Sequence, residues 1–383
     1  MHLNKKVAGI YFHIPFCKQA CHYCDFHFST NLEIRQEMVR TMLRELTLRQ
    51  SYLGGESVQT IYFGGGTPSM LSVDELAQFC QTVAKSFSLD NGAEVTLEAN
   101  PDDLTQEKLK GLRSIGVNRL SIGIQSFSNR VLQYLNRSHD APAAIRSFDD
   151  ARSAGFGNIS IDLIFAIPEQ SDEMWRNDIA QALALEPDHI SAYSLTIEKS
   201  TVFGNMLKRG KLFPLDDDVA AARMDVLATQ LTARGYDHYE VSNFGKPGYY
   251  SRHNSSYWQR KKYLGIGPSA HSFDGRSRQF NVSNNHVYVK ALREDRIPCE
   301  KEILSRSELV NDYLLTTLRT SWGCDLRVLK TEFDYDIVTK NRDYVARLVA
   351  ERLADLDGNC LKLTGKGKLL ADRISSDLFL IGD

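Results

Sequence analysis

Residues 7–26 read VAGIYFHIPFCKQACHYCDF, and residues 58–68 read VQTIYFGGGTP. Each stretch begins as a run of apolar residues and then stops, the first at a loop with three cysteines and the second at three glycines. Short runs rich in Ile, Val and Tyr with little alternation are typical of strands buried on both faces of a parallel sheet. The two stretches therefore predict buried strands that carry chemical groups at their carboxyl ends.

Four more apolar runs follow, and amphipathic stretches with apolar residues at three- and four-residue spacing separate them, which predicts helices. The six runs cover 7–14, 58–63, 93–99, 117–124, 158–167 and 189–195, and the helical stretches cover 33–51, 72–87, 105–114, 141–154 and 171–185. Strand–helix units in series form a parallel sheet with helices outside it. The fold class is therefore predicted to be α/β, either an open doubly wound sheet or an incomplete (β/α)6 barrel.

Residues suited to chemistry gather where these strands are predicted to end. The cysteine loop follows the first run and GGGTP (64–68) follows the second. Glu98 closes the third run, Gln125 follows the fourth and Asp162 lies within the fifth. Both candidate architectures bind ligands at the carboxyl ends of their strands, so these residues are predicted to share one site.

Beyond residue 200 the alternation stops, and we predict three units at 1–200, 201–300 and 301–383 because one core rarely serves so long a chain. The middle unit is predicted to hold a helix at 217–234 and then loop-rich, aromatic sequence to about 298. The last unit is predicted to hold helices at 306–320, 325–333, 342–354 and from 366, with an apolar run at 361–363. This mainly helical unit resembles a winged helix, for which we expect a structural or partner-docking role.

Composition narrows the class of protein. The formal net charge is −2, from 46 Lys and Arg against 48 Asp and Glu, which does not suit a general nucleic-acid binder. No apolar run approaches the roughly 20 residues that cross a bilayer, and the start of the chain does not resemble a secretory signal. Three of the seven cysteines fall within eight residues and the others are scattered, which favours reduced thiols, a cytoplasmic location and one metal site.

The three clustered cysteines, Cys17, Cys21 and Cys24, leave two kinds of metal site open. Zinc needs a fourth ligand, which His22 or His27 could supply as a Cys3His site. An iron–sulfur cubane can instead use three cysteines for three irons and leave the fourth iron for an outside ligand.

The motif CX3CX2C followed by an aromatic residue, together with GGGTP after the next strand, resembles the signature of the radical S-adenosylmethionine (SAM) superfamily. The flanking HIPFC is similar to the oxygen-independent coproporphyrinogen III oxidase family. The resemblance implies an incomplete (β/α)6 barrel and a [4Fe-4S] cluster bound by Cys17, Cys21 and Cys24. It also implies that the amino and carboxylate groups of SAM chelate the fourth iron.

The same resemblance implies roles for further residues, taken position by position. Tyr11 would border the cluster, Tyr23 would use its backbone near adenine, and Gly65, Gly66 and Thr67 would hold the methionine part of SAM. The positions implied to surround SAM are Glu98 in LEANP, Gln125 in GIQSF, Arg137 in LNRSH and Asp162 in SIDLIF. A carboxylate can accept bonds from an ammonium group or ribose hydroxyls, and an arginine can bind the methionine carboxylate.

Within that family the chain is more similar to the haem chaperone subgroup, HemW, than to the oxidases. Oxidases carry a further cysteine two residues after the third, where this chain has Phe26, and they have an N-terminal extension where few residues precede the first run. HNSSYW (253–258) fits the HNXXYW motif of the subgroup, and YLGIGPSAHSF (263–273) follows it.

Imidazole is a common haem ligand and flat aromatic rings suit a macrocycle. His253 is therefore the candidate for haem contact, directly or through its environment, with Tyr257 and Trp258 as apolar surface. The alternative is that His253 forms a hydrogen-bonded turn and that the two aromatic residues belong to the core. His13 and His271 are further imidazoles predicted near the site.

The function expected from the resemblance is a cytoplasmic haem chaperone that carries a [4Fe-4S] cluster with SAM. It would pass haem to an acceptor, a respiratory or membrane-bound haem protein, and cluster assembly would change its oligomeric state toward a homodimer. One alternative is the oxidase itself, in which a deoxyadenosyl radical initiates the decarboxylation of two propionate side chains. A second is a zinc-stabilised binding module.

Overall fold

A single open sheet of twelve strands organises most of the computed structural model, which describes residues 6–382. Its order is β12-β11-β10-β9-β1-β2-β3-β4-β5-β6-β8-β7. The central strands, all parallel, are β1 (Val7–Ile14), β2 (Ser57–Gly65), β3 (Leu89–Ala99), β4 (Arg119–Gln125), β5 (Ile159–Phe165) and β6 (His189–Ser194). The two end strands do not pair with each other, so the barrel is incomplete, as predicted.

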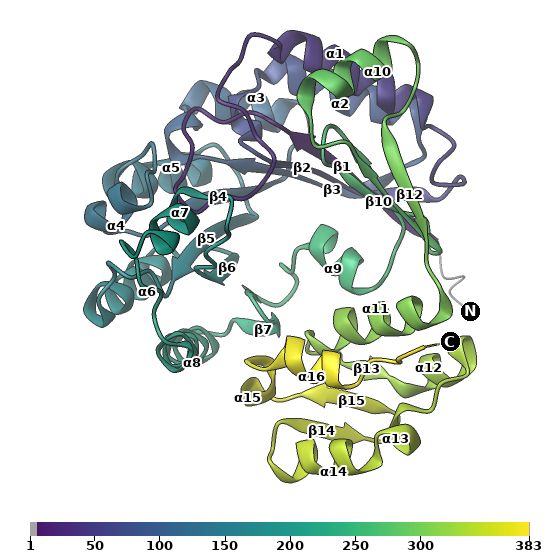
Figure 1. Ribbon diagram of the computed structural model, residues 1–383. Helices are drawn as coiled ribbons and strands as arrows, with labels where there is room; N and C mark the ends of the chain where they lie inside the picture. The colour runs from purple at the N-terminus through teal and green to yellow at the C-terminus, as the bar shows by residue number, and fades with distance from the viewer. Residues whose placement is uncertain (1–5, 383) are drawn as a thin grey trace.

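The helices that connect the parallel strands cover the outer side of the curved sheet (Figure 1). They are α1 (Arg35–Leu48), α2 (Val73–Ser86), α3 (Gln106–Ser114), α4 (Asn129–Tyr134), α5 (Ala141–Ser153) and α6 (Asp172–Leu185). Helix α2 begins with a capping box in which Ser72 and Glu75 each accept from the other's backbone N–H. Between sheet and helices the core is close-packed, and the rings of Phe12 and Phe63 stack at 4.9 Å.

Beyond residue 200, α8 (Asp217–Ala233) confirms the helix predicted at 217–234. The stretch predicted to be loop-rich contains regular structure, so that expectation was wrong. The other helices of this region are α7 (Val202–Lys208), α9 (Arg252–Trp258) and α10 (Asn285–Arg293). Its strands are β7 (Asp237–Glu240), β8 (Asn243–Gly245), β9 (Tyr263–Ile266), β10 (His271–Phe273), β11 (Ser277–Asn281) and β12 (Cys299–Ile303). These strands have three to five residues and extend both ends of the sheet through backbone pairing, so they carry too little side-chain pattern to be recognised.

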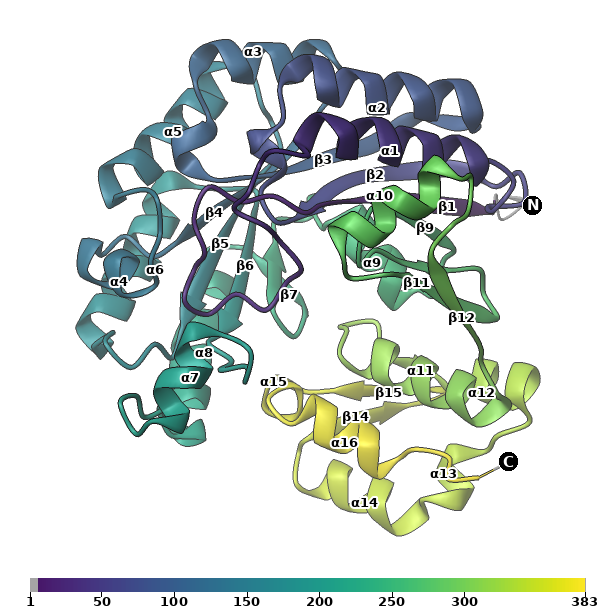
Figure 2. The same ribbon diagram turned by 45° about the horizontal axis from the view of Figure 1, so that its top comes forward.

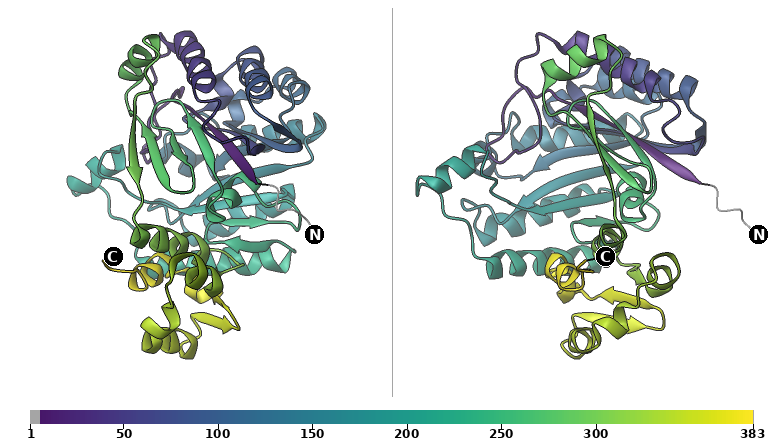
Figure 3. Two further views of the ribbon diagram at one scale, coloured as in Figure 1. Left: turned by 90° about the vertical axis from the view of Figure 1, so that its right-hand side faces the viewer. Right: turned by 45° about the vertical axis from the view of Figure 1, so that its right-hand side comes forward.

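The C-terminal unit has its own hydrophobic core and forms a separate body at one side of the sheet (Figure 3). It contacts both ends of the sheet, because Thr320 pairs with Glu240 of β7 and Asp312 pairs with Arg278 of β11. Its elements are α11 (Arg306–Leu318), β13 (Cys324–Asp325), α12 (Leu326–Phe333), α13 (Ile337–Lys340), α14 (Arg342–Ala350), β14 (Ala354–Asp357), β15 (Cys360–Leu363), α15 (Gly365–Lys368) and α16 (Ala371–Asp377). The last predicted helix is thus two short helices. Within residues 6–382 no helix is long and apolar enough to cross a membrane.

Candidate functional site

The loop after β1 is held against the end of β2. The backbone N–H groups of Gly66 and Thr67 donate to the carbonyls of Ile14 and Phe16 at 2.8 and 2.7 Å. A Cβ atom on Gly66 would lie 2.6 Å from the Phe16 carbonyl oxygen, closer than a side chain can come. Glycine at this position therefore lets the two strand ends meet.

The far side of the same loop is tied to the segment after α4. The backbone N–H of His22 donates to the Leu135 carbonyl at 3.1 Å, and the amide of Asn136 donates to the Ala20 carbonyl at 2.7 Å. Figure 2 shows the loop passing in front of β4 and β5. The cysteines are thus fixed over the carboxyl ends of the parallel strands.

Cys17, Cys21 and Cys24 line one cavity of about 500 Å³, which we call the cysteine cavity. The hydroxyl of Thr67 donates to the sulfur of Cys17 at 3.3 Å. Burial raises the pKa of Cys17 to about 12 and that of Cys24 to about 11, so without a metal both thiols are protonated at neutral pH.

The three thiols do not form a mononuclear zinc site. No three His, Cys, Asp or Glu side chains among residues 6–382 converge closely enough to hold one metal ion. His22 Nδ1 lies 2.9 Å from the Tyr134 carbonyl, and His27 Nε2 lies 2.8 Å from the amide oxygen of Asn285. Zinc needs four convergent donors, which these side chains do not offer in this arrangement, whereas three cysteines that line one cavity suit a cubane with one open iron.

Arg137 brings a buried cation to the cysteines. Its Nη1 lies 3.3 Å from the sulfur of Cys21 and 3.3 Å from the hydroxyl of Tyr23. Its Nη2 donates to the side chain of Asn100 at 2.6 Å and to the Gly123 carbonyl at 2.9 Å. Its buried Nε has no hydrogen-bond partner in the described chain, so a donor remains for an acidic ligand group.

Glu98 lies at the end of β3 and accepts from the hydroxyl of Tyr62 at 2.7 Å. The backbone N–H of Gly65 also bonds to this carboxyl group. Burial outweighs these bonds and raises the pKa of Glu98 to about 7. An ammonium group needs acceptors, so the backbone groups of this turn that can serve one are its carbonyl oxygens.

Asp162 on β5 is a further polar residue that lines the cysteine cavity. Its carboxylate accepts from the hydroxyl of Ser121 at 3.2 Å, and burial raises its pKa. Gln125, the last residue of β4, has a φ of 69°, a left-handed conformation that is uncommon outside glycine and typical of functional strand ends.

Arg119 is a buried cation that lines the same cavity and that sequence reasoning missed. Its Nε has no hydrogen-bond partner in the described chain. An arginine inside the apolar run VNRLSIGI was the available signal, because a charged residue is rarely buried without a partner.

Most predicted site residues thus meet in one place. The cysteine cavity is lined by Cys17, Cys21, Cys24, Tyr23, Gly65, Gly66, Thr67, Glu98, Gln125, Arg137 and Asp162. Tyr11 and His253 do not line it.

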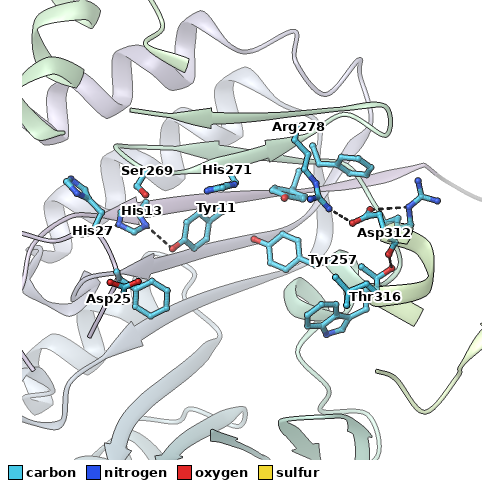
Figure 4. Close-up of a pocket in the computed structure, with 16 residues that line it drawn as sticks. Tyr11, His13, Asp25, His27, Tyr257, Ser269, His271, Arg278, Asp312 and Thr316 are labelled. Atoms are coloured by element: carbon cyan, nitrogen blue, oxygen red, sulfur yellow. Dashed lines mark hydrogen bonds and ion pairs between the residues drawn. The ribbon is translucent and has the colours of Figure 1, made fainter. Parts of the chain in front are cut away.

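A second cavity of about 490 Å³ lies beside the first, and Asp25 and Phe26 line both. We call it the aromatic cavity, because Tyr11, Phe26, Tyr257, Trp258, Tyr263 and Phe273 contribute to it. Figure 4 shows His27, His13 and Tyr11 toward one end, with the Arg278–Asp312 pair toward the other. Helix α9 serves both cavities, since Asn254 lines the first and Tyr257 and Trp258 line the second.

His253 is buried, and both ring nitrogens are engaged. Its Nδ1 lies 2.8 Å from the hydroxyl of Thr60 and its Nε2 lies 2.7 Å from the hydroxyl of Tyr257. Its ring stacks on Tyr62 at 4.9 Å, and burial lowers its pKa to about 3. In this arrangement a neutral His253 orients Tyr257, and any effect on a ligand passes through its surroundings.

The other two imidazoles line the aromatic cavity but differ in their bonding. His13 is buried, with Nδ1 3.2 Å from the Tyr11 hydroxyl and Nε2 2.8 Å from the His27 carbonyl. His271 is exposed, and its ring nitrogens make no hydrogen bond within the part of the chain that the structure describes.

Comparison with known proteins gives the family. Residues 11–182 match the radical SAM superfamily. A protein named heme chaperone HemW from Lactococcus lactis is 35% identical over 380 residues, which cover 99% of each chain. Another of that name from Mycobacterium tuberculosis is 35% identical over 96% of this chain and 93% of its own. This chain belongs to the HemW family.

A solved structure similar to this chain is coproporphyrinogen III oxidase (HemN) from Escherichia coli, described as a radical SAM enzyme. The TM-score is 0.84 at 22% identity, over 98% of this chain and 90% of the other. The likeness confirms the radical SAM fold, an α/β partial barrel with a smaller C-terminal unit, for this member of the HemW family. At 22% identity this similarity shows the fold alone.

Proposed function

We propose that the protein is a haem chaperone, which binds haem together with a [4Fe-4S] cluster and SAM and passes the haem to an acceptor haem protein. The observation that carries this proposal is the full-length similarity to proteins named heme chaperone HemW, at 35% identity over 99% of both chains. The two adjoining cavities support it, because one presents thiols and the other presents aromatic surface.

In the proposed site Cys17, Cys21 and Cys24 hold the cluster, which when bound supplies one-electron chemistry and an iron with an open coordination position. The high pKa values of Cys17 and Cys24 mean that cluster binding must release protons. The nearby Arg137 guanidinium offsets part of the negative charge that the thiolates then carry. Tyr23 supports that guanidinium through its hydroxyl.

SAM would lie in the rest of the cysteine cavity. Arg137 has an unused buried donor for the methionine carboxylate, and the turn of Gly65, Gly66 and Thr67 offers carbonyls for the ammonium. Glu98, Gln125 and Asp162 present side-chain acceptors for the remaining polar groups.

The rival function is that of the oxidase. At 22% identity the similarity to HemN does not indicate that the two proteins share an activity. In addition, Phe26 occupies the position at which the oxidase pattern has a further cysteine. Anaerobically reconstituted protein should leave coproporphyrinogen III unchanged while it binds haemin and releases it to an apo-haemoprotein. Formation of protoporphyrinogen would contradict the chaperone proposal.

The acceptor that we propose is a respiratory or membrane-bound haem protein met on the cytoplasmic side. Nucleic acid is not expected as a partner at a net charge of −2. A change to a homodimer on cluster assembly is tested by size-exclusion chromatography before and after anaerobic reconstitution, with haemin added in each state. An unchanged elution volume would contradict it.

A further inference from the structure

The aromatic cavity has the chemistry of a porphyrin site. Its walls are rings: Tyr257 and Tyr263 meet edge to face at 4.6 Å, and Tyr263 lies 6.2 Å from Phe273. At about 490 Å³ it is within the range of cavities that hold a small ligand. Flat apolar rings favour a flat apolar ligand.

Among the imidazoles that line this cavity, His271 is the one with neither ring nitrogen bonded to a described residue, whereas His27 uses its Nε2 on Asn285. It begins β10 and projects toward the space beside Tyr11 and Tyr257 (Figure 4). A haem ligand needs a ring nitrogen with a free lone pair. Both ring nitrogens of His13 and of His253 are taken by protein groups, whereas those of His271 bond to nothing in residues 6–382.

The opposite end of the cavity carries guanidinium groups that can donate to an acidic group. Arg278 pairs with Asp312, and the Nε of Arg260 lies 3.6 Å from the same carboxylate, so two guanidinium groups share one lining carboxylate. Glu332 also lies near Arg260, so two carboxylates face the two guanidinium groups, and Arg278 is the more exposed of the two cations. Its side chain is 42% exposed, and beyond Asp312 its fork makes no hydrogen bond with the described residues. The buried indole N–H of Trp258 is also without a partner there.

We infer that the aromatic cavity is the haem site, in which His271 is an axial ligand and Arg278 holds a propionate. The inference rests on the proposed function, because haem is the ligand in both. It separates the haem from the cysteines, none of which line this cavity, while Asp25 and Phe26 form a wall that both ligands would share.

The ligand is tested by haemin titration of the full chain, with cluster and without it, followed by absorption and electron paramagnetic resonance spectroscopy. His271→Ala should lose the spectral signature of imidazole ligation and bind haemin at least about ten-fold more weakly, and added imidazole should restore the signature. The matched control is His286→Ala, an exposed imidazole on α10 outside the cavity, which should match the wild type.

The propionate contact is tested with haemin dimethyl ester, which lacks the acidic groups. The wild type should bind the ester about ten-fold more weakly than haemin. Arg278→Gln should bind both equally weakly, whereas Arg276→Gln, an exposed arginine that does not line the cavity, should keep the wild-type preference.

Two outcomes distinguish a failure of the proposed function from a failure of the proposed haem site. A wild type that does not bind haemin overturns the proposed function and the site with it. A wild type that binds haemin, with an unchanged spectrum in His271→Ala, overturns the site and leaves the chaperone function standing.

Discussion

The guanidinium of Arg137 lies 3.3 Å from the sulfur of Cys21, although 116 residues separate them in the chain. The contact joins the cysteine loop after β1 to the segment after α4. It places a permanent positive charge next to one of the three sulfurs proposed to hold the cluster.

Arg137→Lys tests whether SAM binding needs the planar guanidinium of Arg137 or only its positive charge. Lysine keeps the charge but lacks the planar guanidinium whose separate nitrogens face Asn100, Gly123 and a ligand carboxylate, so SAM affinity should fall at least about ten-fold. Anaerobic calorimetry on the reconstituted protein measures it. Arg130→Lys, an exposed ion-pair residue on α4, is the control. Equal SAM affinity in Arg137→Lys would remove the residue from the SAM site.

Serine substitution of the three cysteines tests the cluster. Cys17→Ser, Cys21→Ser and Cys24→Ser should each reduce iron and sulfide well below the roughly four per chain of a full cubane. Cys80→Ser, a partly buried cysteine on α2, should keep the wild-type content. Stoichiometric zinc in oxygen-protected protein would contradict the assignment.

Glu98 makes the folding stability of the cofactor-free protein depend on pH. Its pKa is about 7 in the folded protein and ordinarily 4.5, so the folded state holds the proton more tightly than the unfolded state. The resulting stabilisation is present below pH 4.5 and is lost as pH rises through 7. From pH 5.5 to 8 the wild type should therefore lose about 1 to 2 kcal/mol relative to Glu98→Gln in urea unfolding.

The comparison needs an exposed carboxyl outside the cysteine cavity as its control. Glu107→Gln changes an exposed residue in the first turn of α3 and should leave the pH dependence of the wild type intact. A Glu98→Gln variant that follows the wild type across this pH range would show that burial does not control the carboxyl.

Gly66→Ala should disturb the junction of the cysteine loop with β2. The new Cβ would meet the carbonyl oxygens of Phe16 and Ile14 at 2.6 and 2.8 Å, so we expect a loss of about 1 to 3 kcal/mol and incomplete cluster incorporation. Gly157→Ala is the control, because nothing lies within 4 Å of its added Cβ. Wild-type unfolding and iron content in Gly66→Ala would refute the expectation.

His253→Ala should weaken haem binding and also lower the stability of the protein. It removes two buried hydrogen bonds and the stack on Tyr62, which we expect to cost about 2 to 4 kcal/mol. Tyr257→Phe removes only one of those bonds and should cost about 1 kcal/mol. In His253→Ala the spectral signature of an imidazole ligand should persist. Its loss would make His253 itself the ligand.

The sequence was sufficient for the six parallel strands because long apolar runs and strong helix caps carry that information locally. The cysteine cavity could be predicted too, since consecutive parallel strands bring their carboxyl ends together. What could not be predicted depends on distant partners. The bonding of His253 is set by Thr60, 193 residues away, and the placement of Tyr11 is set by the side of β1 on which it falls.

The aromatic cavity was beyond the reach of sequence patterns for a related reason. Several of its rings come from short strands and from α9. Each element contributes one or two aromatic residues, which in the sequence cannot be told apart from ordinary core or surface residues. Only the pairing of β9 with β1 and of β10 with β9 brings His271 opposite Tyr257 and within reach of Arg278.

Asp312, Leu315 and Thr316 on α11 form part of that cavity, yet α11 belongs to the hydrophobic core of the C-terminal unit. The pocket therefore spans two independently packed bodies, joined by polar contacts such as Ser321 with Tyr239 and Lys368 with His238. Any displacement of the C-terminal unit would therefore move one wall of the cavity. A partner bound to this unit could thus act on the cavity without entering it.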